Sequence, residues 1–105
     1  MKRIETIKDK KEFNKVIKTG EFKKNNLLVL YYIVNNNDVI NKYGVAISNK
    51  VGKAHIRNKL KRQVRSIIDN NRNLFKNKGK YIIMVRKSCL NASYQELEKA
   101  LIELL

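Results

Sequence analysis

Apolar and polar residues recur along the chain with two periods, and the helical period predicts a first helix over residues 10–19. Its apolar face consists of Phe13, Val16 and Ile17. Asp9, followed three residues later by Glu12, is typical of a capping box at the start of a helix. Gly20 is typical of a helix end.

Continuous apolar runs rich in β-branched and aromatic residues predict strands. These runs are Leu27–Val34, Tyr43–Ser48 and Lys80–Val85. We also expect a short edge strand at Glu21–Lys24 and a turn at Asn35–Asp38. The first run is apolar throughout, which favours a central strand covered on both faces. Tyr32 would then lie on the face opposite to Tyr31, in the core.

Helical spacing returns in two later segments. The first is a helix over about residues 54–70, whose apolar arc of roughly 120° holds Ile56, Leu60, Val64, Ile67 and Ile68. The second begins after Ser93, which forms a capping box with Glu96. Its apolar face consists of Leu97, Ala100, Leu101 and Leu104.

The predicted order is α-β-β-β-α-β-α, which indicates an α+β fold, an α-β sandwich with helices packed on a mixed four-stranded sheet. The chain contains no proline and has no repeat or long linker, so we expect one domain over residues 1–105. The helix at 54–70 should cross between two adjacent parallel strands, and the general rule for such crossovers predicts a right-handed one.

Charge adds a prediction about partners. Lys and Arg number 24 against 9 Asp and Glu, which gives a net charge of +15. Residues 39–68 and 70–95 contain no acid, so Asp69 alone interrupts a long acid-free region and one side of the protein should be strongly positive. Such a protein is attracted to polyanions, most often nucleic acid.

Other residue types exclude several classes of protein. Cys89 is the only cysteine and His55 the only histidine, so an intrachain disulfide and a Cys/His metal cluster are excluded. No apolar run reaches the length of a membrane span, and the first residues lack the apolar centre of a secretion signal. We therefore expect a soluble cytoplasmic protein.

The helix at 54–70 carries the strongest functional signal. Its polar side has no acid before Asp69, and like charges four residues apart, such as Arg57 with Lys61, each cost a few tenths of a kcal/mol. A purely solvated face and a membrane-surface helix are two alternatives. The absence of acids disfavours a purely solvated face. The absence of Trp and Phe from the apolar face disfavours a membrane-surface helix. A polyanionic partner explains the pattern best.

The segment KVGKAHIRNKLKRQVR, Lys50–Arg65, resembles the signature region of the protein subunit of bacterial ribonuclease P. The residues around Glu12–Gly20, Leu28–Tyr32 and Tyr81–Lys87, and the GVAIS segment, also match that family in order. The resemblance implies the α-β-β-β-α-β-α sandwich with a left-handed crossover through the basic helix.

The resemblance also implies a function. A catalytic RNA with Mg²⁺ removes the 5′ leader from precursor tRNA, while the protein binds that RNA and the leader and raises affinity for substrate and Mg²⁺. The resemblance implies that the protein holds no metal tightly and does no chemistry alone. We expect no membrane or DNA partner. Which residues would organise metal stays open.

Site residues are carried over from the resemblance position by position. Contacts with the catalytic RNA are implied for Lys50, Gly52, Lys53, Arg57, Asn58, Lys59, Lys61, Arg62 and Arg65. A leader-binding cleft is implied for Phe13, Ile17 and Tyr31. Three positions depart from the family pattern: Lys59 replaces an arginine, Asn49 a lysine and Ile17 a frequent aromatic residue.

Two other functions stay open on the residues alone. One is a ribosomal or RNA-chaperone-type protein of similar fold, which would explain the charge but not a cleft. The other is a DNA-binding protein, which should have a second helix beside the basic one, whereas strands are predicted there. Catalysis by the protein itself has little support, because Asp69 and His55 are the only candidate acid–base groups in the central half.

Overall fold

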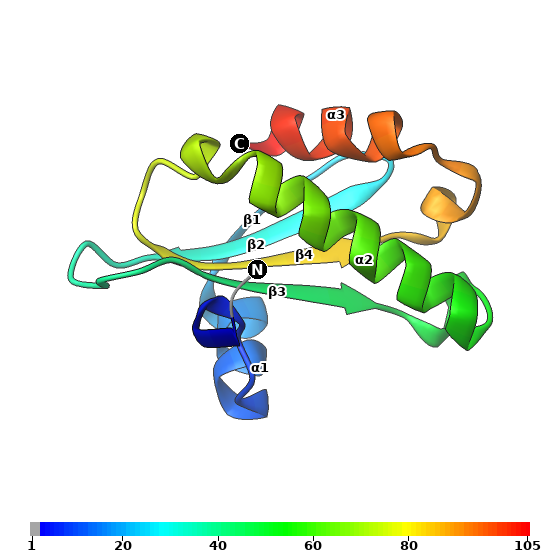
Figure 1. Ribbon diagram of the computed structural model, residues 1–105. Helices are drawn as coiled ribbons and strands as arrows, with labels where there is room; N and C mark the ends of the chain where they lie inside the picture. The colour runs from blue at the N-terminus through cyan, green and yellow to red at the C-terminus, as the bar shows by residue number, and fades with distance from the viewer. Residues whose placement is uncertain (1–2) are drawn as a thin grey trace.

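The computed structural model describes residues 3–105 and confirms the predicted order of elements (Figure 1). The helices are α1 (Lys10–Thr19), α2 (Ala54–Asn70) and α3 (Tyr94–Leu104). The strands are β1 (Glu21–Lys24), β2 (Leu28–Val34), β3 (Lys42–Ile47) and β4 (Gly79–Val85). Short 3-10 helices occur at Arg3–Glu5, Asn49–Val51, Arg72–Leu74 and Lys87–Asn91.

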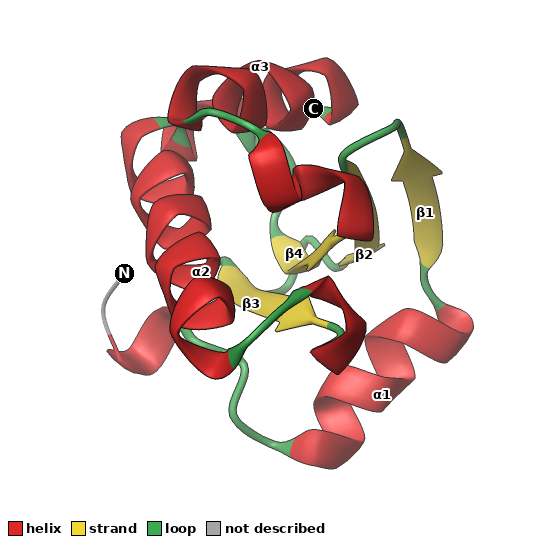
Figure 2. Ribbon diagram, turned by 90° about the vertical axis from the view of Figure 1, so that its right-hand side faces the viewer, coloured by secondary structure: helices red, strands yellow, loops and turns green. Residues whose placement is uncertain are grey.

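The four strands form one mixed sheet in the order β1-β2-β4-β3. Strand β2 pairs antiparallel with β1 and β4, whereas β3 and β4 are parallel neighbours joined through α2. The crossover is left-handed, as the family resemblance implies, so the general right-handed rule gives the wrong prediction here (Figures 1 and 2). A right-handed crossover would place α2 on the face of the sheet that α1 covers.

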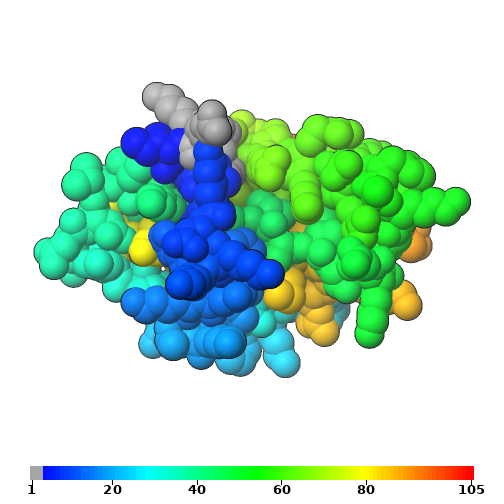
Figure 3. Space-filling model, turned by 90° about the horizontal axis from the view of Figure 1, so that it is seen from below, coloured from blue at the N-terminus to red at the C-terminus, as the bar shows by residue number. Residues whose placement is uncertain are grey.

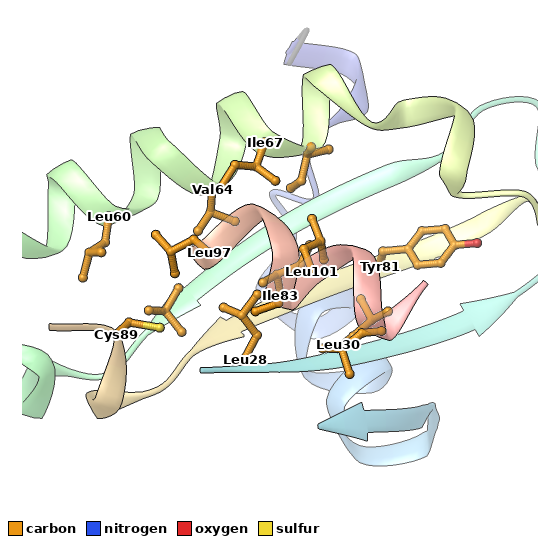
Figure 4. Packing of buried hydrophobic residues seen from close by; sticks show 14 of the residues in the cluster. Leu28, Leu30, Leu60, Val64, Ile67, Tyr81, Ile83, Cys89, Leu97 and Leu101 are labelled. Carbon is orange, nitrogen blue, oxygen red and sulfur yellow. The ribbon is translucent and has the colours of Figure 1, made fainter. Parts of the chain in front are cut away.

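The helices cover the sheet from two sides: α2 and α3 lie on one face and α1 on the other (Figure 1). The main core lies between the sheet and the α2/α3 layer, where Leu28, Ile83, Val64 and Leu101 are almost fully buried (Figure 4). Cys89 belongs to this core. A smaller cluster of Ile7, Val16 and Ile82 holds α1 against the opposite face.

The capping predictions hold in part. The Asp9 carboxylate accepts a hydrogen bond from the Lys11 backbone N–H at 2.9 Å and so caps α1. Glu12 does not complete that box, because its carboxylate turns to the sheet and pairs with Lys80 at 3.0 Å. The box at Ser93 and Glu96 is complete in both directions, with bonds of 3.0 and 3.1 Å.

Tyr31 and Tyr32 lie on opposite faces of β2, as predicted. Tyr32 packs against the main core and stacks on Tyr81, with ring centroids 6.4 Å apart. Tyr31 packs against the small cluster under α1. In the part of the chain that the structure describes, no helix combines the length and the apolar character that crossing a bilayer requires.

Candidate nucleic-acid interface

Helix α2 presents separate apolar and cationic faces. Its residues Leu60, Val64, Ile67 and Ile68 are buried, and the helix contacts β3 and α3. The opposite side carries the polar residues that the resemblance implicates. Asn58, Lys59, Arg62 and Arg65 are exposed, and Arg57 and Lys61 are half-buried. The half-buried pair lies at the boundary, where an aliphatic stem packs on the apolar surface and the charge reaches solvent.

The cations of α2 spread around its exposed side, with Arg62 between Lys59 and Arg65. Arg57, Lys61 and Arg65 follow one another at four-residue spacing and form a column along the helix, which we call the cationic column. Lys59 lies about 160° around the helix from its neighbour Lys61. That side faces α3, because Ser66, which shares it, lies 2.9 Å from the hydroxyl of Tyr94 on α3. The structure therefore separates Lys59 from the column.

The fold does not neutralise the cations of α2. Between residues 3 and 105, the ion pairs join Lys42 and Lys80 to Glu12, and Arg72 to Glu5 and Asp69. No basic side chain of α2 takes part in them. The two carboxylates beside Arg72 raise its pKa, so this arginine is committed to a contact between the N-terminal segment and the end of α2.

The segment between β3 and α2 brings further cations next to the column. Lys50 and Lys53 are both exposed there. The Arg57 guanidinium donates a hydrogen bond of 2.5 Å to the side-chain oxygen of Asn49. A lysine at this position, the residue typical of the family, could not accept that bond and would repel Arg57 instead. Asn49 therefore helps to orient Arg57, a role that the sequence pattern gave no reason to predict.

Packing does not explain the glycine at position 52. A Cβ atom placed on Gly52 would meet Ile56 at 3.5 Å, an ordinary van der Waals distance. The neighbouring 3-10 helix, Asn49–Val51, contacts the one that follows β4, Lys87–Asn91. Two basic segments thus lie side by side beyond the C-terminal ends of the parallel strands.

The other face of the sheet brings together the three residues predicted for a leader-binding cleft. Phe13, Ile17 and Tyr31 all pack against the small cluster beneath α1, and each remains partly exposed. Gly44 makes this arrangement possible, because a Cβ atom there would lie 2.8 Å from the ring of Phe13. The phenyl ring therefore rests directly on the backbone of β3.

Helix α1 leaves part of this face open. Glu12 lies on the side of α1 that contacts Lys80. Because an α-helix turns by about 100° per residue, Phe13 and Ile17 lie on the other side. On that side the sheet register aligns Val29, Met84 and Ala46 in one row across β2, β4 and β3. All three are partly exposed. The alternation of side chains along the strands would have identified them once the pairing was known.

Figure 3 views the molecule from the α1 side, with α1 (blue) across the middle. The segments after β3 (green) and after β4 (orange) lie beside it. They carry exposed Lys50, Arg86 and Lys87. The open face therefore has an apolar, partly aromatic floor and a cationic border, which suits a single nucleic-acid strand better than a duplex.

The two candidate acid–base groups of the central half lie far apart. His55 is exposed near the start of α2, and Asp69, close to its end, accepts hydrogen bonds from Arg72 at 2.8 and 3.2 Å. Fourteen residues of helix separate the two groups by about 21 Å. No group of three His, Cys, Asp or Glu side chains that could hold a metal ion occurs among residues 3–105.

Comparisons with known proteins agree with this architecture. The sequence model of the family described as Ribonuclease P matches residues 1–105. The ribonuclease P protein component of Mycoplasma mycoides subsp. mycoides SC is 40% identical over 106 residues, covering 100% of this chain and 96% of that protein. The corresponding protein of Alkaliphilus oremlandii is 35% identical over 105 residues, covering 100% and 91%.

Solved structures give the same result for the fold. The RNase P protein from Thermotoga maritima superimposes with a TM-score of 0.86 at 26% identity, covering 96% of this chain and 94% of that one. The RNase P protein of Staphylococcus aureus has a TM-score of 0.86 at 23% identity, with coverage of 95% and 91%. The mixed sheet with its left-handed crossover is thus the arrangement of a known structural family.

Proposed function

Because the chain belongs to the ribonuclease P family, we propose that it is the protein subunit of a ribonuclease P that removes the 5′ leader from precursor tRNA. The observation that carries this proposal is the cationic column of Arg57, Lys61 and Arg65, which no carboxylate of the described chain neutralises. A folded helix retains such repulsion at a cost, and the phosphates of an RNA partner remove it.

The partner of this surface is the catalytic RNA. Arg57, Arg62 and Arg65 provide planar guanidinium groups for phosphate oxygens, and Asn58 can hydrogen-bond a sugar or a base edge. Lys50 and Lys53 extend the contact into the segment before α2. Gly52 lacks a packing reason within the protein, so we assign it to close approach of the RNA backbone. Lys59, on the α3 side of the helix, belongs to the edge of this contact.

The open face beside α1 binds the single-stranded leader. Phe13 and Tyr31 offer rings on which bases stack, and Ile17, Val29 and Met84 provide apolar contact. Stacking tolerates any base, because every base has a π-face. A processing enzyme that acts on many precursor tRNAs requires such tolerance.

Magnesium belongs to the RNA in this proposal. The donor set of the described chain does not fit a protein-held ion, because its carboxylates are scattered and three of them already pair with cations. The protein would raise affinity for magnesium indirectly, by holding the catalytic RNA and its substrate in the conformation that binds the ion.

Reconstitution tests the proposal. A bacterial ribonuclease P RNA is assayed for cleavage of precursor tRNA at low magnesium, with and without the protein. We expect cleavage to increase when the protein is present. Unchanged cleavage together with binding to any RNA would refute the subunit function and favour a ribosomal or chaperone-type RNA-binding protein.

Two variants separate the two surfaces. Arg62→Ala should weaken binding to the catalytic RNA and reduce its salt dependence, because one phosphate contact is lost. Phe13→Ala should lower affinity for precursor tRNA and leave affinity for mature tRNA, which has no leader, unchanged. An equal loss for both tRNAs would overturn the assignment of the leader to the α1 side.

A further inference from the structure

The sheet register places a third aromatic ring beside the predicted leader-binding residues. Phe22 in β1 pairs with Tyr31 in β2, Tyr31 with Ile82 in β4, and Ile82 with Gly44 in β3. Since paired residues point to the same face, all four positions lie on the α1 side. Phe13 rests on Gly44, so the rings of Phe13, Tyr31 and Phe22 lie along one row, with the fully buried Ile82 between Phe13 and Tyr31.

Phe22 is not required by the core. Its side chain is 58% exposed, among the largest exposures of any apolar side chain in the described residues. Among residues 3–105 its ring meets one other ring, that of Tyr31, with centroids 6.0 Å apart and planes tilted by 42°. Neither hydrophobic cluster of the described residues includes Phe22. Its exposed ring is therefore available for stacking by a bound base.

The charged residues around Phe22 favour binding of a nucleic-acid strand. Lys24 pairs with Val29 and so lies on the α1 side in the adjacent row. Glu21, which pairs with Tyr32, points to the opposite face. Glu12, the acid of α1, lies on its far side against Lys80. An aromatic ring beside a lysine, with the nearby acids turned away, complements a single nucleic-acid strand.

We propose that Phe22 is a further leader-binding residue, which extends the leader track from α1 to the outer edge of the sheet at β1. This inference rests on the proposed function, because it places the leader on the same face. With strands about 4.8 Å apart, the row from β3 to β1 spans about 14 Å. That length holds about four nucleotides at the roughly 3.4 Å spacing of a stacked strand, and fewer if the strand is stretched.

The extra ring also explains a departure from the family pattern. Ile17 occupies a position where an aromatic residue is frequent, so α1 offers one stacking surface fewer. Phe22 supplies an aromatic surface from the opposite side of Tyr31. The track therefore keeps three rings, with one of them displaced toward the sheet edge.

The experiment measures affinity of the reconstituted holoenzyme for precursor tRNAs whose leaders lengthen one nucleotide at a time. Phe22→Ala should leave the affinity for short leaders unchanged. Once the leader is long enough to reach β1, the variant should bind about fivefold more weakly, the lower end of the range for one base–aromatic stack. A 2-aminopurine placed at that leader position should be quenched by the wild type and less by the variant.

Three variants make the readout specific. Phe22→Tyr keeps the ring and should retain wild-type affinity, whereas Phe22→Leu keeps apolar area without stacking and should behave like alanine. Val34→Ala is the matched control, because Val34 is 44% exposed on the neighbouring strand but faces the other side of the sheet. It should have no effect at any leader length.

Two negative results are distinguishable. If Phe13→Ala weakens binding of every leader while Phe22→Ala has no effect at any length, the extension to β1 is wrong and the leader assignment stands. If neither variant has an effect, the leader does not bind this face, and the part of the proposed function that assigns the leader to it is wrong. A loss with Phe22→Ala that is the same for mature tRNA would also overturn the inference.

Discussion

Lys61→Gln should stabilise the free protein and weaken its binding to RNA. Lys61 is the middle member of the cationic column, with Arg57 four residues before it and Arg65 four residues after it. Each like-charge pair at this spacing costs about 0.2–0.5 kcal/mol, so removal of two pairs should raise the free energy of unfolding by about 0.4–1 kcal/mol. Lysine and glutamine have similar helix propensities, so the backbone contributes little to the change.

Two measurements check this prediction. Thermal unfolding at low salt should show a higher Tm for the variant, by a few degrees for a chain of this size. The gain should disappear near 1 M salt, where the Debye length of about 3 Å is shorter than the spacing of neighbouring side chains. Binding to the catalytic RNA should weaken, and the slope of log affinity against log salt should fall by about 0.7–0.9.

Lys99→Gln is the control. Lys99 is exposed on α3, and Glu103 lies four residues after it, so this change removes an attractive pair. It should lower stability by a few tenths of a kcal/mol and leave RNA binding unchanged. The reasoning is refuted if Lys61→Gln has the same unfolding free energy as wild type at low salt, or if its effect does not depend on salt.

Three further predictions follow from individual contacts. Asn49→Lys adds a charge but removes the hydrogen-bond acceptor for Arg57. The slope of log affinity for RNA against log salt, compared with that of Asn49→Ala, should therefore increase by less than one phosphate contact contributes. Gly44→Ala places a Cβ atom 2.8 Å from the Phe13 ring and should destabilise the fold by about 1–3 kcal/mol in denaturant unfolding. Burial raises the pKa of the Cys89 thiol, so alkylation at neutral pH should be slow in the folded protein and fast in denaturant.

Local patterns predicted most of the elements because their causes are local. Residues 54–70 were predicted as a helix and form one, since apolar spacing within a helix depends only on neighbours in the sequence. Glu12 shows the limit of such reasoning. Its position suits a capping box, but Lys80 from β4 offers a charged partner, and the carboxylate turns to it.

The candidate site was predicted unevenly. The cationic residues of α2 could be found in the sequence, because the absence of acids is visible there. Their division into the column and the separate Lys59 needed the position of α3. The roles of Asn49, Gly44 and Phe22 depend on contacts between residues of different elements, which the sequence pattern within one element does not show.

The elements, the cationic helix face and the family of the chain could all be predicted before the fold was known, because they depend on residue type and short-range order. The family resemblance supplied the left-handed crossover, which the residue pattern did not give, and the tertiary structure was needed to add Phe22, Val29 and Met84 to the open face. The reason is physical: the pairing of β1 with β2 and of β3 with β4 fixes the cross-strand neighbours. A shift of one residue in that register would turn Phe22 to the other face.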